Sequence, residues 1–90
     1  MNKRIIKKAM QTEHYQRDKL HASIKASCLS SLDLIGASEL NAQLVCNHVE
    51  KWLDNKEEVT SADIRRVAGA GLFKYNPSAA YVYVNIDDVV

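Results

Sequence analysis

The stretch "IIKKAMQTEHYQRDKL", residues 5–20, places two short segments with strand-like composition directly before the start of an amphipathic helix. Residues 4–9 mix aliphatic with basic side chains, and residues 13–15 have the length of a short partner strand across a turn at residues 10–12. That turn lacks the Asn-Gly and Gly-X pairs that favour two-residue connections. The order of the segments therefore predicts a β-hairpin with an unusual turn composition.

A helix follows this hairpin. In "QRDKLHASIKAS", residues 16–27, and just beyond it, Leu20, Ile24 and Cys28 recur at every fourth position, which places them on one helical face. Lys19 and Lys25 remain on the polar side. The spacing predicts the first helix of a small helical core.

The next two helices have start signals of their own. Gly36 separates the first helix from a second one, which we expect to run from Ser38, as its cap, to Leu53. "TSAD", residues 60–63, is a capping-box pattern, in which a hydroxyl and a carboxylate satisfy the first amides of a third helix. The expected apolar face of the second helix consists of Leu40, Leu44, Val45, Val49, Trp52 and Leu53.

The third helix contains two glycines that need a structural reason. Gly69 and Gly71 each cost about 1 kcal/mol relative to Ala inside a helix. Close approach by a neighbouring helix would offset this cost, and we expect such a contact. The predicted apolar stripe of this helix consists of Ile64, Val67, Ala68, Gly71, Leu72 and Tyr75.

The C-terminal segment carries two contradictory signals. "YVYVNI", residues 81–86, is β-branched and aromatic with a two-residue alternation, which is typical of a strand. Asn76 and Pro77 form a helix-start pair, and Ala79 and Ala80 also favour a helix. The pattern alone supports both structures equally.

Length and charge limit the classes of function. A chain of 90 residues forms at most one domain with a modest core. Residues 1–25 contain seven basic and two acidic residues, whereas the rest contains five and nine, so a net charge of +1 hides a strong polarity. This polarity fits either a face for an anionic ligand or a basic N-terminus on an ordinary domain. The two cysteines are far apart, and neither a secretory signal nor a membrane-length apolar segment is present, so we expect a cytoplasmic protein without membrane contact.

Motifs of catalysis and metal binding are missing. The sequence contains no GxxxxGK[ST], GxGxxG or GxSxG pattern, which excludes a Walker-type nucleotide hydrolase. Cys46 and His48 are two positions apart, so on a helix they point about 200° apart and cannot share one metal ion. Cys28, His14 and His21 add no zinc-type spacing. We expect no enzyme and no metal site, with both cysteines in the core and His21 and His48 at the surface or its boundary.

The order of these segments resembles the ATP-cone, a nucleotide-binding regulatory module of many ribonucleotide reductases and of the bacterial repressor of their genes. The family opens with a pattern of the form V-x-K-R-D-G-x-x-x-x-F-[DN]-x-x-K-[IL], and residues 5–20 align with it without a gap. "VTSADIRRVAGAGL", residues 59–72, is similar to the family's third-helix entry, and "NPSAAYVYV", residues 76–84, is similar to its closing segment. The resemblance covers essentially the whole chain and rests on the order of its motifs.

The resemblance implies an α+β fold with one domain over residues 1–90. A small N-terminal β-hairpin or three-stranded lid, residues 1–15, would cover a four-helix bundle, residues 16–90, with a purine nucleotide held between them. It also favours a helix for the ambiguous C-terminal segment. The chain contains neither the catalytic barrel of a reductase nor the paired cysteines of the repressor's zinc ribbon.

Eight nucleotide-binding residues follow from the resemblance: Ile5, Lys7, Lys8, Glu13, Lys19, Leu20, Ser61 and Arg65. The lysines would surround the triphosphate, the serine and arginine would lie near the base and sugar, and the two aliphatic side chains would sandwich the ring. The glutamate matches an acid of the second strand. Without the resemblance, the lysines are most simply solvated surface charges.

The chain departs from the family at both ends of this site. Ala9 and Met10 replace an Asp-Gly turn, in which the glycine permits a positive φ. Tyr83 stands where an arginine is common, and Asp87 and Asp88 follow where a basic end is expected. Carboxylates pointing inward at that end would repel a triphosphate.

The function implied by the resemblance is that of a freestanding regulatory module. It would bind ATP or dATP without hydrolysis and control a protein partner or its own oligomeric state, with a link to ribonucleotide reductase. Mg²⁺ could accompany the nucleotide, although the sequence identifies no protein ligand for it. The alternative is a cone-shaped scaffold that no longer binds nucleotide and acts in protein–protein contact, or on nucleic acid through its basic N-terminus. Nucleic acid is not the expected partner of the first function.

Overall fold

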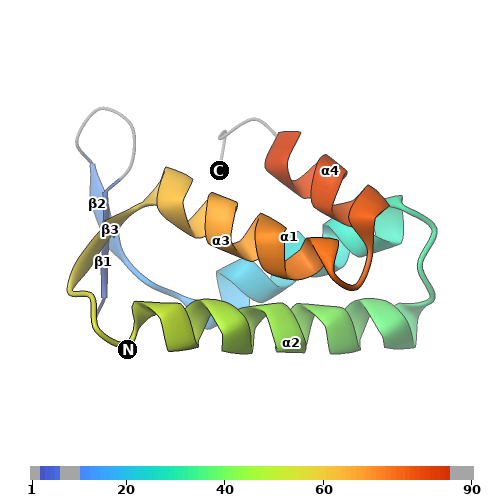
Figure 1. The fold of residues 1–90 in the computed structure, drawn as a ribbon, viewed down its shortest axis with the longest axis horizontal. Coiled ribbons are helices and arrows are strands. Elements are labelled where there is room, and N and C mark those ends of the chain that lie inside the picture. Colours follow the sequence, from blue (N-terminus) through green and yellow to red (C-terminus); the bar gives the residue numbers. More distant parts are fainter. Residues whose placement is uncertain (1–2, 7–10, 86–90) are drawn as a thin grey trace.

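The structure, a computed structural model, describes residues 3–6 and 11–85. These residues form a small α+β domain in which three short strands lie at one end of four helices (Figure 1). The expected α+β class with three strands and four helices is therefore confirmed. The elements are β1 (Arg4–Ile6), β2 (Thr12–His14), α1 (Arg17–Ser30), α2 (Ile35–Leu53), β3 (Glu58–Thr60), α3 (Ser61–Phe73) and α4 (Pro77–Asn85).

The sheet joins segments that are far apart in the sequence. Its order is β2-β1-β3, with β1 antiparallel to β2 and parallel to β3. Ile5 pairs with Val59, and both side chains are buried. The predicted boundary at residue 15 between the β lid and the helical bundle is thus wrong for the third strand, which comes from the connection between α2 and α3. A single buried valine between exposed neighbours is too short a pattern to reveal a strand. The second strand ends at His14, one residue before the predicted end at Tyr15.

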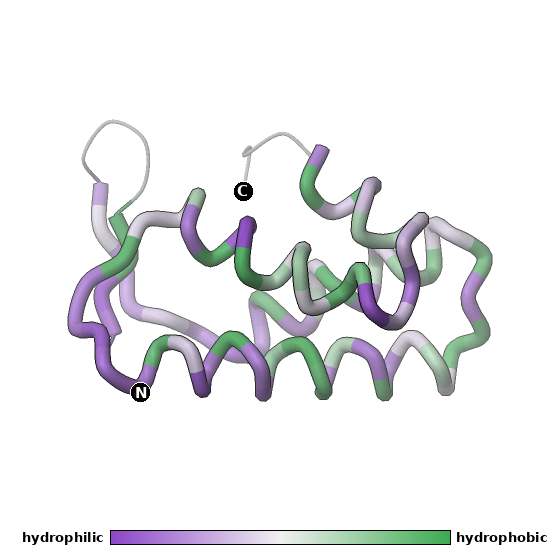
Figure 2. The backbone as a smooth tube through the Cα atoms, viewed as in Figure 1, coloured by the Kyte–Doolittle hydropathy of each residue, from purple (hydrophilic) through white to green (hydrophobic). Residues whose placement is uncertain are grey.

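The core lies between the helices. α1 contacts α2 and α4, while α3 contacts α2 and α4. The largest fully buried side chains include Ile24, Leu53 and Leu72, one from each of α1, α2 and α3. Cys28 and Cys46 are buried free thiols, as predicted. Polar residues of α2 lie mainly on the side away from α3 (Figure 2).

The start of α2 differs from the prediction. The helix begins at Ile35, so Gly36 lies inside its first turn and Ser38 is not the cap. Ser38 is fully buried, and its hydroxyl has no hydrogen-bond partner among the described residues. Leu40, predicted to lie in the core, is 54% exposed, because small residues such as Ala42 occupy the inward face instead.

The end of α1 has an unusual residue in a common turn. The amides of Leu32 and Asp33 donate to the carbonyls of Leu29 and Cys28, both at 3.1 Å, which is the bond pattern of a Schellman motif. Leu32 takes the left-handed position of this motif, with φ of 65°. That position normally holds Gly or Asn, because a side chain there costs about 1–2 kcal/mol.

The predicted start of α3 and its glycine contacts are confirmed. Thr60 Oγ1 accepts from the amide of Asp63 at 3.0 Å, and the carboxylate of Asp63 accepts from the amide of Thr60 at 3.4 Å. A Cβ on Gly69 would lie 2.5 Å from Val84 Cγ1, and one on Gly71 would lie 2.9 Å from His48 Cδ2. Both glycines therefore allow α4 and α2 to approach α3.

The C-terminal segment is a helix, as the resemblance implies. Asn76 Oδ1 accepts from the amide of Ala79 at 3.0 Å and so caps α4. Ala79, Ala80 and Tyr83 are buried on one face, which outweighs the strand preference of the β-branched residues. α3 ends at Phe73, so Tyr75 belongs to the connection and is 49% exposed, contrary to its predicted place in the stripe. No helix formed by the described residues is both long and apolar enough to cross a membrane.

Candidate nucleotide site

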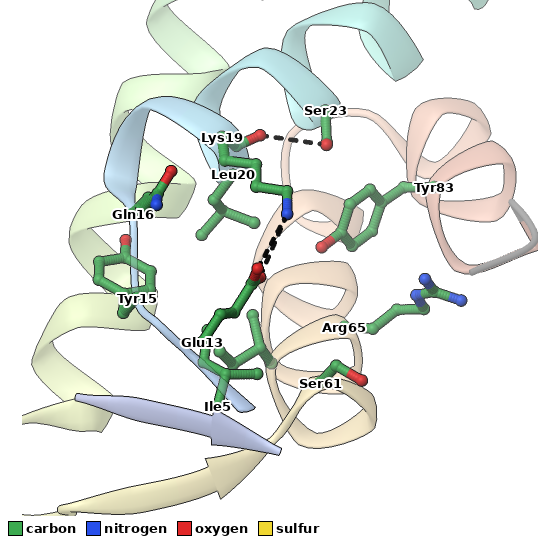
Figure 3. A pocket seen from close by; sticks show the side chains of 11 residues that line it. Ile5, Glu13, Tyr15, Gln16, Lys19, Leu20, Ser23, Ser61, Arg65 and Tyr83 are labelled. Atoms are coloured by element: carbon green, nitrogen blue, oxygen red, sulfur yellow. Dashed lines mark hydrogen bonds and ion pairs between the residues drawn. The ribbon is translucent and has the colours of Figure 1, made fainter. Parts of the chain in front are cut away.

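A pocket lies where the sheet meets the first turns of α1 and α3 and the inner side of α4 (Figure 3). Its cavity has a volume of about 110 Å³. Its lining consists of Ile5, Glu13, Tyr15, Gln16, Lys19, Leu20, Ser23, Ser61, Ile64, Arg65 and Tyr83.

The pocket brings together six of the eight residues selected from the sequence. They come from four elements: β1, β2, α1 and α3. Lys7 and Lys8 lie outside the described residues, as do the turn residues Ala9 and Met10 and the acidic pair Asp87 and Asp88. All of the predicted site residues that the structure describes therefore lie around one pocket.

The base of the pocket is apolar. Ile5 of β1, Leu20 of α1 and Ile64 of α3 are each at most 8% exposed, and all three line the cavity. Each is a buried residue near the sheet end of its element, so three separate segments place aliphatic carbon at one point. Such a surface suits the faces of a flat, weakly polar ring.

An ion pair lies at the mouth of the pocket. Lys19 Nζ is 3.2 Å and 3.3 Å from the two carboxylate oxygens of Glu13, and the side chains are 44% and 30% exposed (Figure 3). A partly exposed pair of this kind contributes about 0–1 kcal/mol. A phosphate oxygen bonded to the same ammonium gains a charge-assisted hydrogen bond, so an anionic ligand can compete with Glu13 for Lys19.

Ser61 and Arg65 form the opposite side of the pocket. Ser61 is the first residue of α3, and Arg65 lies one turn further along the same helix. The Arg65 side chain extends from α3 to the α4 side of the pocket, away from Lys19 (Figure 3). Tyr83 of α4 is 7% exposed. Its ring lies above Ser61 and Arg65 in Figure 3, with the hydroxyl directed toward the pocket.

Five lining residues are absent from the sequence-based set: Tyr15, Gln16, Ser23, Ile64 and Tyr83. Ser23 follows Lys19 by one helical turn, and its hydroxyl donates to the Lys19 carbonyl at 3.1 Å, so its helical spacing was an available signal. Ile64 belongs to the predicted stripe of α3. Tyr83 was noted only as a departure from the family, and nothing in the local pattern places it in a cavity.

A hydrogen-bonded network holds one wall of the pocket. Tyr15 Oη donates to Glu50 Oε2 at 2.9 Å, and Arg17 Nη1 lies 3.0 Å from Glu50 Oε1. Burial, and then the hydrogen bond to Glu50, raise the pKa of Tyr15 well above its usual range. The bond to Glu50 also raises the pKa of Arg17. Tyr15 thus stays a neutral donor that fastens the end of the hairpin to α2.

The chemistry of the site is that of binding an anion beside an apolar surface. Lys19 and Ser61 lie in the first turns of α1 and α3, where the helix dipole is positive.

Among residues 3–6 and 11–85, no three His, Cys, Asp or Glu side chains are grouped as a metal site requires. Burial raises the pKa of the Cys46 thiol to about 11, so this thiol is protonated at neutral pH.

Comparison with protein-family models finds no match to this chain. Comparison with curated proteins finds no match either.

Proposed function

We propose that this protein is an ATP-cone-like regulatory module that binds ATP or dATP without hydrolysing it. The observation that carries the proposal is the convergence of Ile5, Glu13, Lys19, Leu20, Ser61 and Arg65 on one pocket. These residues were selected from the sequence through the family resemblance, and they come from segments up to 60 positions apart. Lys7 and Lys8 would add further cations for the triphosphate.

The size of the cavity supports one orientation of the nucleotide. Small-molecule sites are typically about 300–1,000 Å³ in volume, whereas this cavity measures about 110 Å³. The apolar base of the pocket therefore receives the purine ring, between Ile5 and Leu20, and the phosphates extend along the open mouth beside Lys19. Glu13 turns away from Lys19 as the phosphates arrive.

Regulation follows from the number of elements that such a ligand would join. A nucleotide in this pocket contacts the sheet, α1, α3 and α4 together, and so favours one arrangement of these elements over others. A partner that prefers this arrangement then binds more tightly when the nucleotide is present. The partner in turn raises the affinity for the nucleotide by the same factor. We propose a protein partner or a change of oligomeric state as the output, ribonucleotide reductase as the linked system, and the cytoplasm as the location.

Thermal unfolding with and without nucleotide tests this proposal. A ligand that binds only the folded state adds about 2.7 kcal/mol at a concentration 100 times its Kd, so ATP and dATP should each raise the thermal midpoint. Lys19→Ala should abolish most of this shift. Lys25→Ala is the matched control, because Lys25 lies on the same helix but pairs with Glu39 outside the pocket. An unchanged midpoint for the wild-type protein would contradict nucleotide binding.

A second function is favoured by two features of the same pocket. Glu13 already holds Lys19, and Tyr83 stands where the family commonly has an arginine. A scaffold that has lost its nucleotide would show both features and would act through protein contacts or through its basic N-terminus. Such a protein shows no midpoint shift with ATP or dATP, and binding through the basic N-terminus would appear as salt-dependent association with DNA.

A further inference from the structure

The connection between α1 and α2, together with the first residue of α2, exposes three large aliphatic side chains. Leu32, Leu34 and Ile35, here called the knob, are 93%, 79% and 71% exposed. Leu32 occupies the left-handed position of the Schellman motif, where Gly would be less strained. Neither the backbone nor the core of the isolated chain accounts for a leucine at this position.

A groove of about 480 Å³ runs between α3 and α4. Small residues allow the two helices to approach and leave the groove open, while Phe73 and Tyr81 form its edges and are 62% and 72% exposed. None of the described residues that line it is charged. The lining of this groove consists of Gly69, Ala70, Phe73, Pro77, Ala80, Tyr81 and Val84.

The charges around the knob and the groove are complementary. Residues 29–40 contain Asp33 and Glu39 and no Lys or Arg. On the groove side, Lys74 directly follows Phe73 and Arg66 lies in α3, whereas Arg65 lines the pocket instead. Some of these charges have partners within the chain, since Glu39 pairs with Lys25 and His21, and Arg66 lies 3.8 Å from Asp63. The carboxylate of Asp33 accepts hydrogen bonds from the neutral side-chain amides of Asn41 and Asn76.

The knob and the groove lie side by side on one molecule. Asn76 Nδ2 donates to Asp33 Oδ2 at 2.7 Å, which joins the α1–α2 connection to the turn before Pro77 at the end of the groove. The knob does not fill the groove of its own chain, because its side chains remain exposed. Adjacent complementary surfaces fit a two-fold axis, in which each knob enters the groove of the other copy.

We propose that a second copy of this chain occupies the groove, so that the protein forms a two-fold dimer with reciprocal knob-in-groove contacts. The interface places Leu32 of each copy between α3 and α4 of the other. Its acidic and basic flanks meet, so association weakens as the ionic strength rises. Among the described residues, the groove and the pocket share no lining residue, so this dimer can form without a bound nucleotide.

Sedimentation velocity over a concentration series tests the dimer with two point variants. Leu32→Gly removes the main knob side chain and relieves the left-handed strain, so the variant should fold at least as well as the wild type. Ala70→Glu places an acid in the groove at an exposed helical position that tolerates it. The wild type should become a dimer as its concentration rises, while each variant alone should remain a monomer.

A mixture of the two variants identifies the geometry of the contact. The Ala70→Glu chain keeps its knob and the Leu32→Gly chain keeps its groove, so an equimolar mixture should regain a dimer with one of the two contacts. A wild-type protein that stays monomeric, a single variant that still forms dimers, or a mixture without dimers would each overturn the proposal. Circular dichroism of both variants verifies that they are folded.

Discussion

The pocket and the groove use different sides of α4 and differ in what lines them. Tyr83 faces the pocket and is 7% exposed, while Tyr81, two residues earlier, edges the groove and is 72% exposed. The pocket combines aliphatic carbon with an ion pair and hydroxyl groups, whereas the described residues that line the groove are all uncharged. Ordered polar groups select a small polar ligand, and an open apolar surface selects another protein.

The comparison also shows why one helix matters to both surfaces. Val84 lies against Gly69 at the base of the groove, and its neighbour Tyr83 lines the pocket. A shift of α4 therefore changes both surfaces at once. Two variants on this helix separate the surfaces, and three further variants sharpen the contrast.

The largest effect is expected for Tyr83→Ala. Removing a buried aromatic side chain costs about 3–5 kcal/mol, so the free energy of unfolding should fall by about 3 kcal/mol in urea denaturation. Tyr81→Ala is the matched control on the groove side, and it should change stability by at most about 0.5 kcal/mol. Equal losses for the two variants would contradict the assignment of opposite environments to these tyrosines.

A smaller effect is expected for Tyr15→Phe. This change keeps the ring in the pocket wall but removes the hydroxyl that donates to Glu50. Loss of a partly buried hydrogen bond to a charged acceptor should lower the free energy of unfolding by about 1.5 kcal/mol. Tyr75→Phe, at a half-exposed tyrosine outside the pocket, should have no measurable effect. A Tyr15→Phe variant with an unchanged free energy of unfolding would show that this bond does not stabilise the pocket wall.

Glu13→Gln should strengthen nucleotide binding by a few-fold. The change removes the carboxylate that competes with phosphate for Lys19, an ion pair with a contribution of about 0–1 kcal/mol. Titration calorimetry with ATP measures the change in Kd. Glu58→Gln serves as control, because Glu58 pairs with Arg4 outside the pocket. Weaker binding by Glu13→Gln would assign Glu13 a direct contact with the ligand.

The smallest effect is expected for Glu39→Gln, which should change how the free energy of unfolding depends on pH. The hydrogen bond from Lys25, aided by the charge of His21, lowers the pKa of Glu39 below its usual 4.5. Because the folded-state pKa is depressed, the stabilisation is present above about pH 4.5 and is lost as the pH falls through the lower folded value. Glu39→Gln should therefore flatten the acid limb of the stability–pH curve without changing the pocket. An unchanged acid limb would contradict a stabilising role for this pair.

Much of the fold could be predicted because its signals are local. The capping box at Thr60 and the Asn76 cap each act within one helical turn of their own position. The two glycines of α3 are recognisable because each is costly inside a helix, which indicates a close neighbour. The third strand could not be predicted, because Val59 becomes part of a sheet only when β1 lies beside it. Leu40 and Tyr75 were placed in the core because periodicity identifies apolar residues but not which of them the neighbouring helices cover.

The candidate site could be predicted to the extent that its residues match the motifs of the family that the sequence resembles. Lys19 and Ser61 lie at helix starts, which are recognisable in the sequence, and the structure brings them to the same pocket. Tyr15 and Tyr83 could not be found in this way, since their positions depend on the contacts of the hairpin end with α2 and of α4 with α1 and α3. The groove has no motif at all, and only the geometry of α3 and α4 reveals it.

The most direct test of the central claim is a titration of ATP into the isotopically labelled protein, followed by amide chemical shifts in NMR spectra. The account predicts that the shifts concentrate at the pocket, around Lys19, Ser61 and Tyr83, and leave Phe73 at the edge of the groove nearly unchanged. No shifts at a large excess of ATP, or shifts confined to the groove, would contradict it.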